Sequence, residues 1–106
     1  MQNRELEAIF LGCQVIGVTL EQIASFAGCG IGTIFRASTG LTVKPSTVRA
    51  IYIAADMLAE QGYPVRRAGK LALKRIPPEA KRQERWGYVK PYVKEILAEA
   101  QAKEEE

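Results

Sequence analysis

The hydrophobic positions of this 106-residue chain follow the period of an α-helix along most of its length. Near the N-terminus they recur three or four residues apart, on one side of an amphipathic helix: Leu6, Ile9, Phe10, Cys13 and Ile16. Glycine and proline separate this segment from those that follow, because glycine commonly ends helices and proline fits their first turn. The pattern predicts helices over residues 3–16, 20–27, 31–38 and 45–61.

The fourth predicted helix carries more apolar surface than one buried stripe accounts for. Its core stripe has helical spacing and consists of Val48, Ile51, Ala55 and Leu58. Tyr52, Ile53 and Met57 extend the apolar surface beyond that stripe. Because large apolar patches are rarely left in water, we expect the C-terminal segment or a second subunit to cover these three residues.

The character of the sequence changes near residue 63. Residues 63–94 contain ten Lys or Arg and two acidic residues, a net charge of about +8, whereas the whole chain carries +3. A positive block on a small chain is typical of nucleic-acid binding, with a solvated linker as the alternative. Within it, "LALKRI" is compatible with a strand or an extended arm. We predict a helical domain over residues 1–62, and a basic segment with a C-terminal helical tail over residues 63–106.

The C-terminal tail has a helical pattern of its own. A short helix is predicted before Gly87 and a longer one from about Pro91. One face of the tail is apolar and consists of Tyr88, Val89, Tyr92, Val93, Ile96 and Leu97. We expect this face to pack against a second subunit in preference to the extra apolar surface of residues 52–57, with Trp86 as an anchor.

Composition narrows the possible functions. The chain has no histidine, and its two cysteines, Cys13 and Cys29, stand at positions typical of reduced core thiols rather than of a metal site. No nucleotide-binding loop, nucleophile motif or pair of catalytic acids is recognisable. No apolar run has the length of a membrane span, and charged residues interrupt the N-terminus. We therefore expect a cytoplasmic protein that is not an enzyme, uses no cofactor or metal, and makes no membrane contact.

Residues 20–39, "LEQIASFAGCGIGTIFRAST", have the pattern of apolar and small residues that is typical of two short helices joined by a tight turn. Thr19 is suited to cap the first helix, and Gly28 to form the turn, where a positive φ is easiest for glycine. The other positions also fit the packing of such a pair of helices. Ile23 and Ala27 are expected to point inward from the first helix, and Ile34 and Ala37 from the second. Ala24 is small where the two helices cross, and Cys29 is an apolar residue that fills the space after the turn.

With a helix before it and "KPSTVRAIYIAADML" after it, this motif resembles the lambda-repressor-like helix-turn-helix superfamily, most closely the Cro and phage-repressor type. The stretch from "VTLEQIASFAG" through "TIFRAS" to "GY" is also similar to the headpiece of the lactose-repressor family. The resemblance covers residues 3–61. It implies a compact all-α domain of four or five helices that binds operator DNA to regulate transcription. Double-stranded DNA and a second copy of the chain, in a homodimer, are the expected partners.

The resemblance also indicates which residues face DNA. The positions that usually touch bases are Ile31, Gly32, Phe35, Arg36 and Thr39. Only Arg36 and Thr39 can hydrogen-bond to a base. Arg36 is suited to a bidentate contact with guanine, and Ile31 and Phe35 are suited to contact thymine methyl groups. Gly30 stands where family members usually carry Ser or Thr, so this helix start lacks a side-chain cap.

A hydroxyl and several cations outside that face are candidates for phosphate contacts. Thr33 lies near the start of the second helix, and Lys44 and Arg49 flank the next helix. Five basic residues occupy the place of the hinge segment that enters the minor groove in the lactose-repressor family: Arg66, Arg67, Lys70, Lys74 and Arg75. The alternative for these residues is a capping or surface-charge role without a ligand.

The sequence favours a small sequence-specific transcriptional regulator, a repressor of phage or plasmid type that occupies a promoter as a homodimer. One alternative is a DNA-recognition subunit of a larger machine, such as a phage small terminase. The other is a protein-interaction module that uses the apolar Ile31 and Phe35 face on another protein.

Overall fold

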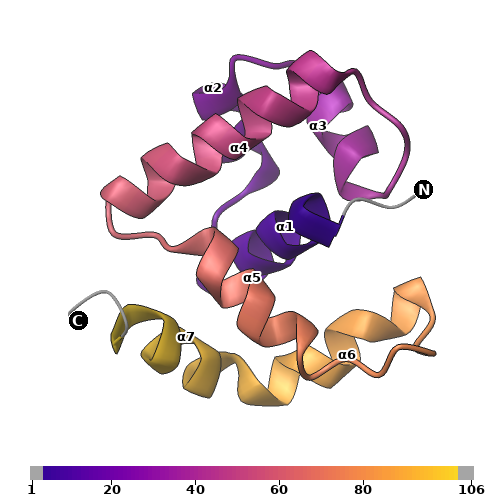
Figure 1. Cartoon of the computed structure of the whole chain (residues 1–106), viewed down its shortest axis with the longest axis vertical. Helices are drawn as coiled ribbons and strands as arrows, with labels where there is room; N and C mark the ends of the chain where they lie inside the picture. Colours follow the sequence, from indigo (N-terminus) through magenta and orange to yellow (C-terminus); the bar gives the residue numbers. More distant parts are fainter. Residues whose placement is uncertain (1–3, 103–106) are drawn as a thin grey trace.

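The computed structural model describes residues 4–102, and within this range every regular element is helical (Figure 1). The elements are α1 (Arg4–Ile16), α2 (Leu20–Ala27), α3 (Ile31–Ser38), α4 (Pro45–Glu60), α5 (Val65–Leu73), η1 (Arg82–Glu84), α6 (Arg85–Val89), η2 (Lys90–Tyr92) and α7 (Val93–Ala102). The all-α class is confirmed, and so are the first four predicted helices, with ends that differ by one residue at most among the described residues; the predicted start at residue 3 lies outside them. None of the described helices has the length and apolar character needed to cross a membrane.

Local sequence explains where α2 begins and ends. The Thr19 hydroxyl accepts a hydrogen bond from Gln22 N at 3.1 Å, and Gln22 Oε1 accepts one from Thr19 N at 2.8 Å, which forms a capping box. Gly28 ends the helix in the left-handed region with φ +69°, and Cys29 N donates to Ala24 O at 3.1 Å. The predicted cap at Thr19 and the positive φ at Gly28 are both confirmed.

α1 lies between the first helices and the C-terminal segment and contributes to two hydrophobic clusters (Figure 1). The buried members of the larger cluster are Leu6, Ile9, Cys13, Ile23, Ala24, Ile34, Ala37, Ile51, Ala54, Ala55, Leu58 and Val65. Those of the smaller cluster are Leu11, Val15, Ala68, Ala72, Val89, Ile96 and Ala100. Because α1 supplies residues to both clusters, it joins α2, α3 and α4 to α5, α6 and α7.

α5 crosses α1 at very short range, because glycine stands on both sides of the contact. A Cβ atom on Gly12 would overlap the carbonyl group of Val65, and a Cβ atom on Gly69 would overlap the carbonyl group of Ala8. Neither glycine has a positive φ, so space rather than backbone conformation requires glycine at both positions. The crossing therefore depends on two residues that lie far apart in the sequence.

Residues 65–73 form a helix, and "LALKRI", which we found compatible with a strand or an extended arm, contributes its first three residues to this helix and the next three to the turn after it. The helix buries Val65, Ala68 and Ala72, three or four residues apart, against α1. Small side chains carry this stripe, so the hydrophobic pattern of the sequence shows it only weakly. The tail differs from prediction in a similar way, because α6 continues through Gly87 instead of ending before it.

The C-terminal tail packs on its own chain, against α1 and α5. Val89 and Ile96 are fully buried there, and Trp86 packs against the same cluster as an anchor. We had predicted that this face packs against a second subunit. The alternative, cover over residues 52–57, is not observed either, since Ile53 and Met57 of α4 remain exposed. Val89 and Ile96 are covered within the chain and need no second subunit, so removal of the tail would uncover part of the core.

Candidate functional site

α3 has one buried side and one exposed side. Ile34 and Ala37 are buried in the larger cluster, whereas Ile31 and Phe35 keep 49% and 57% of their surface exposed. The five positions predicted to touch bases are all exposed: Ile31, Gly32, Phe35, Arg36 and Thr39. Because helical neighbours are three or four residues apart, these positions share one side of α3. The structure therefore brings the predicted base-contacting residues together on one accessible surface, which we call the α3 face.

The start of α3 is open to a close approach. Gly30 precedes the helix with φ −69° and ψ 150° and supplies no side-chain cap, as the sequence indicated. Nothing lies within 4 Å of a Cβ atom built on Gly30 or on Gly32. Thr33, in the first turn, is half-buried. The backbone of this first turn is thus accessible to a ligand that packs flat against the helix.

The end of α3 is held by side-chain hydrogen bonds. The Thr39 hydroxyl donates to Arg36 O at 2.9 Å, and the Ser38 hydroxyl donates to Phe35 O at 2.7 Å. Arg82 Nη2 donates to Ser38 O at 2.7 Å, which places a cation at the negative end of the helix dipole. Sequence reasoning missed Arg82, because its contact with Ser38 joins residues that no local pattern connects.

Lys44 and Arg49 belong to the element that follows α3. Lys44 precedes the first residue of α4, and Arg49 lies in its second turn. Both side chains are exposed, and neither forms an ion pair with another residue of the described range. Their charges are accordingly available to a partner.

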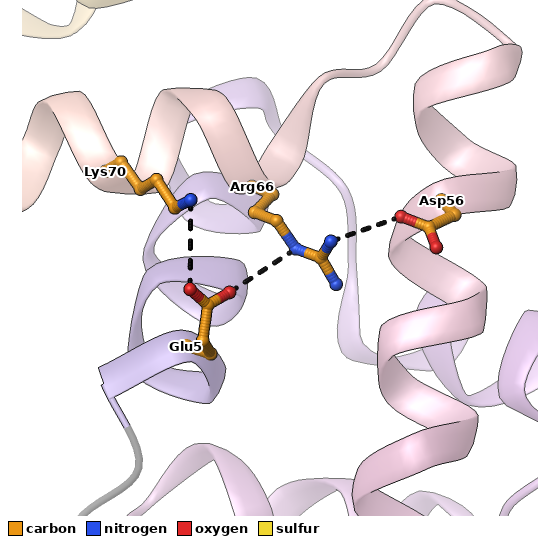
Figure 2. Close-up of polar contacts among 4 residues, drawn as sticks. All are labelled: Glu5, Asp56, Arg66 and Lys70. Carbon is orange, nitrogen blue, oxygen red and sulfur yellow. Dashed lines mark ion pairs between the residues drawn. The ribbon is translucent and has the colours of Figure 1, made fainter.

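The basic residues of α5 are engaged differently. The Arg66 guanidinium lies 3.6 Å from Glu5 and 3.3 Å from Asp56, and Lys70 Nζ lies 3.8 Å from the same Glu5 carboxylate (Figure 2). Arg66 also stands over the Tyr52 ring, 5.3 Å from its centroid. Arg66 thus ties α5 to both α1 and α4.

Two further cations of the basic segment show how α5 meets the tail. Arg67 Nη1 donates to Ala100 O at 3.2 Å, near the end of α7. Lys74 is exposed and forms no ion pair with any described residue. Together with Arg66 and Lys70 these residues line a shallow cleft of about 460 Å³. α5 lines this cleft, and α1 lies between α5 and α3 (Figure 1). The predicted DNA-binding residues therefore form two separate groups, one around α3 and one around α5.

Much of the positive charge predicted to attract nucleic acid is paired inside the fold. Arg75 lies 3.2 Å from Glu95 and stands over the Tyr92 ring, 4.3 Å from its centroid. Arg85 pairs with Glu7 of α1. All four paired carboxylates, those of Glu5, Glu7, Asp56 and Glu95, come from outside residues 63–94, which is why charge counted along the sequence overstates the potential of this segment.

The two cysteines differ in accessibility. Burial raises the pKa of the Cys13 thiol from 9.0 to about 12, so Cys13 stays protonated at neutral pH. Cys29 is half-buried and packs against the larger cluster after the turn, as predicted. Within the described range no three His, Cys, Asp or Glu residues are placed to hold a metal ion.

Comparison of the chain with known protein families, with curated proteins and with solved structures found no match.

Proposed function

We propose that this chain is a sequence-specific DNA-binding transcriptional regulator, a repressor of phage or plasmid type. In this proposal α2 and α3 form the helix-turn-helix of a lambda-repressor-like domain, and the α3 face enters the major groove. The observation that carries it is the division of α3 into a buried side, with Ile34 and Ala37, and an exposed side, with Ile31 and Phe35. An isolated small domain gains nothing by exposing two large apolar side chains, so the exposure points to a partner.

The side chains of the α3 face are suited to contact the edges of base pairs in the major groove. Arg36 can donate two parallel hydrogen bonds to guanine, and Ile31 and Phe35 can contact thymine methyl groups. Gly32 leaves room for the DNA to approach the backbone, since nothing stands near its Cβ position. The Thr39 hydroxyl donates to Arg36 O, so its remaining capacity is to accept a hydrogen bond, for example from a base amino group.

Phosphate contacts in this proposal come mainly from beside the α3 face. Thr33, Lys44 and Arg49 lie on α3 or on the element that follows it, and the two cations are unpaired among the described residues. Arg66 and Arg67 are held by contacts within the fold, which leaves Lys74, just after the end of α5, as the most available cation of this group. Phosphate contacts position a protein on DNA without reading its sequence.

We assign the dimer contact of this proposal to α4. One reading helix samples few base pairs, and a two-fold dimer doubles the contacts and fixes the half-site spacing near one DNA turn. Ile53 and Met57 remain exposed on one side of α4, whereas Val89 and Ile96 of the tail are buried within the chain and only Tyr88 and Tyr92 of its apolar face remain exposed. Sedimentation should therefore show a dimer that Met57→Glu converts to monomer, while Tyr88→Glu, on the exposed part of the tail, leaves the mass unchanged. A wild-type chain that stays monomeric on palindromic DNA contradicts the assignment.

Selection of bound duplexes from a random-sequence pool tests DNA recognition directly. We expect one motif to be enriched, and its affinity to exceed that of a scrambled duplex by about a thousandfold or more. The logarithm of the affinity should fall linearly with the logarithm of the salt concentration, because phosphate contacts release counterions. A pool that stays random after repeated rounds, with no binding at low salt, contradicts the proposal.

A protein-interaction module is the second candidate, and the apolar character of the same face favours it. Besides Ile31 and Phe35, Leu41 in the loop after α3 keeps 59% of its surface exposed. Exposed large apolar side chains, two on α3 and one in the loop after it, are typical of a protein partner. An interaction module would show no salt-dependent DNA binding, so the same selection separates the two candidates.

A further inference from the structure

A cleft of about 730 Å³ lies between α1, the loop that follows α3, and the turn formed by η1 and α6. Its apolar lining includes Phe10 of α1, Leu41 and Val43 of the loop, and Trp86 of α6. Small-molecule sites in proteins commonly have such a volume, with mostly apolar walls and a few polar groups. The C-terminal residues of α3 form part of the wall, so the cleft adjoins the end of α3.

Three charged side chains line this cleft. Arg85 is ion-paired with Glu7, and both side chains are mostly buried. Arg82 has no carboxylate partner in the described range, and its Nη2 donates to the backbone carbonyl of Ser38 at 2.7 Å. Two cations and one anion leave the lining with a net positive charge. Guanidinium groups match the geometry of oxyanions, so an anionic ligand suits this lining better than a neutral or cationic one.

We propose that the cleft binds a small organic anion whose apolar body, of the size of one or two aromatic rings, packs against Phe10, Leu41 and Trp86. Arg82 holds the oxyanion, because its guanidinium is exposed and is engaged only by a neutral carbonyl. Arg85 remains paired with Glu7 and joins α6 to α1 on the floor of the site. Charge-assisted hydrogen bonds are about twice as strong as those between neutral groups, so an oxyanion competes well with the Ser38 carbonyl.

Ligand binding is coupled to α3 through Arg82. The Arg82 guanidinium stabilises the negative end of the α3 dipole at Ser38 and lies against Gly40, whose φ is +88°. An oxyanion that draws Arg82 away from Ser38 loosens the end of α3 and lowers the affinity of the α3 face for DNA. This second half of the inference rests on the proposed function, whereas ligand binding itself does not.

Two probes that differ only in charge test the binding half. Anilinonaphthalenesulfonate carries an oxyanion on an aromatic body, and phenylnaphthylamine has the same rings without the sulfonate. Trp86 is the only tryptophan of the chain and lines the cleft, so energy transfer from it reports binding to the full-length protein. We expect saturable binding of one sulfonate probe per chain, at least tenfold tighter than binding of the neutral probe. Equal affinity for the two probes, or no saturable binding, overturns the proposal.

Substitutions test whether the probe binds in the cleft. Arg82→Gln should weaken the sulfonate probe about tenfold and leave the neutral probe unchanged, and Lys90→Gln, which removes the same charge outside the cleft, should change neither. The comparison between probes on the wild-type chain holds even if Arg82→Gln impairs folding. A loss of sulfonate affinity with Arg36→Gln instead of Arg82→Gln puts the probe on the α3 face and overturns the assignment.

The coupling half is tested on a selected DNA duplex in the presence of the sulfonate probe. A saturating probe should reduce DNA affinity at least threefold in the wild type and have no effect on Arg82→Gln. DNA affinity that is unchanged while the probe is bound overturns the coupling but not the binding site. A chain that binds the probe and never binds DNA overturns the coupling together with the proposed function, and leaves the binding half established.

Discussion

α3 and α5 carry the two groups of residues that the sequence marks for DNA, and the fold treats them in opposite ways. The α3 face is exposed, and Arg36 forms no ion pair within the described range. On α5, Arg66 is clamped between Glu5 and Asp56, and Arg67 bonds to the end of α7. The comparison teaches that a basic run marks a binding surface only where the fold leaves its charges unpaired.

The largest expected effect breaks the packing of α5 on α1. Gly69→Val would drive its side chain into the carbonyl of Ala8, and the free energy of unfolding should fall by more than about 3 kcal/mol, at the upper end of overpacking effects. Gly32→Ala, on the open side of α3, is the control and should stabilise the helix by roughly 0.5–1 kcal/mol while it weakens DNA binding. Chemical denaturation measures both. A Gly69→Val variant as stable as the wild type would show that α5 does not cross α1 closely.

The next effect concerns recognition by α3. Arg36→Ala should lose about 1–3 kcal/mol of affinity on the selected duplex and relax the base preference at one position, because a bidentate contact is removed. Its melting temperature should stay that of the wild type, since Arg36 is exposed and unpaired among the described residues. Fluorescence anisotropy with cognate and scrambled duplexes distinguishes the roles. An equal loss on both duplexes would make Arg36 a phosphate contact.

The turn between α2 and α3 tests how the face is presented. Gly28→Val should destabilise the fold by about 1–2 kcal/mol, because a β-branched residue is strained at φ +69° even where space is open. Gly30→Ser is the matched variant, since φ is −69° there and the new hydroxyl can cap α3, and it should stabilise the fold by about a few tenths of a kcal/mol. Thermal melts measure both. Equal melts for the two variants would contradict the left-handed turn.

The smallest expected effect concerns α5, the other helix of the comparison. Arg66→Ala leaves the carboxylates of Glu5 and Asp56 without this cation, and it should cost about 0.5–1 kcal/mol of stability, because the pairs are partly exposed to solvent. DNA affinity of the folded fraction should remain within twofold of the wild type. Lys74→Ala, which removes an unpaired cation of the described range just after the end of the same helix, should leave the melt unchanged and reduce the salt dependence of DNA binding. A tenfold loss of DNA affinity with Arg66→Ala would return α5 to the DNA surface.

Sequence reasoning succeeded where structure is local. The Thr19 cap, the Gly28 turn and the inward positions Ile34 and Ala37 each depend on neighbours within a few residues, so a single stretch contains the whole signal. The exposed face of α3 then follows from helix geometry, because it is the side opposite Ile34 and Ala37.

The rest of the fold could not be predicted, because its determinants are distant in sequence. The close crossing of α5 over α1 depends on Gly12 and Gly69, which meet only after the two helices pack. Arg66 finds its partners at Glu5 and Asp56, and Arg82 reaches Ser38. Contacts between residues far apart in the sequence do not show in its hydrophobic periodicity. The charges of the basic segment therefore looked more available to a partner than they are.

Amide chemical-shift changes on addition of the selected duplex test the central claim most directly. Our account predicts that the largest changes fall on residues 31–39, with smaller ones at Lys44 and Arg49, while the amides of Arg66 and Arg67 stay unperturbed. Changes concentrated on α5, or spread evenly over the described helices, would contradict the claim that α3 is the DNA surface and α5 a structural element.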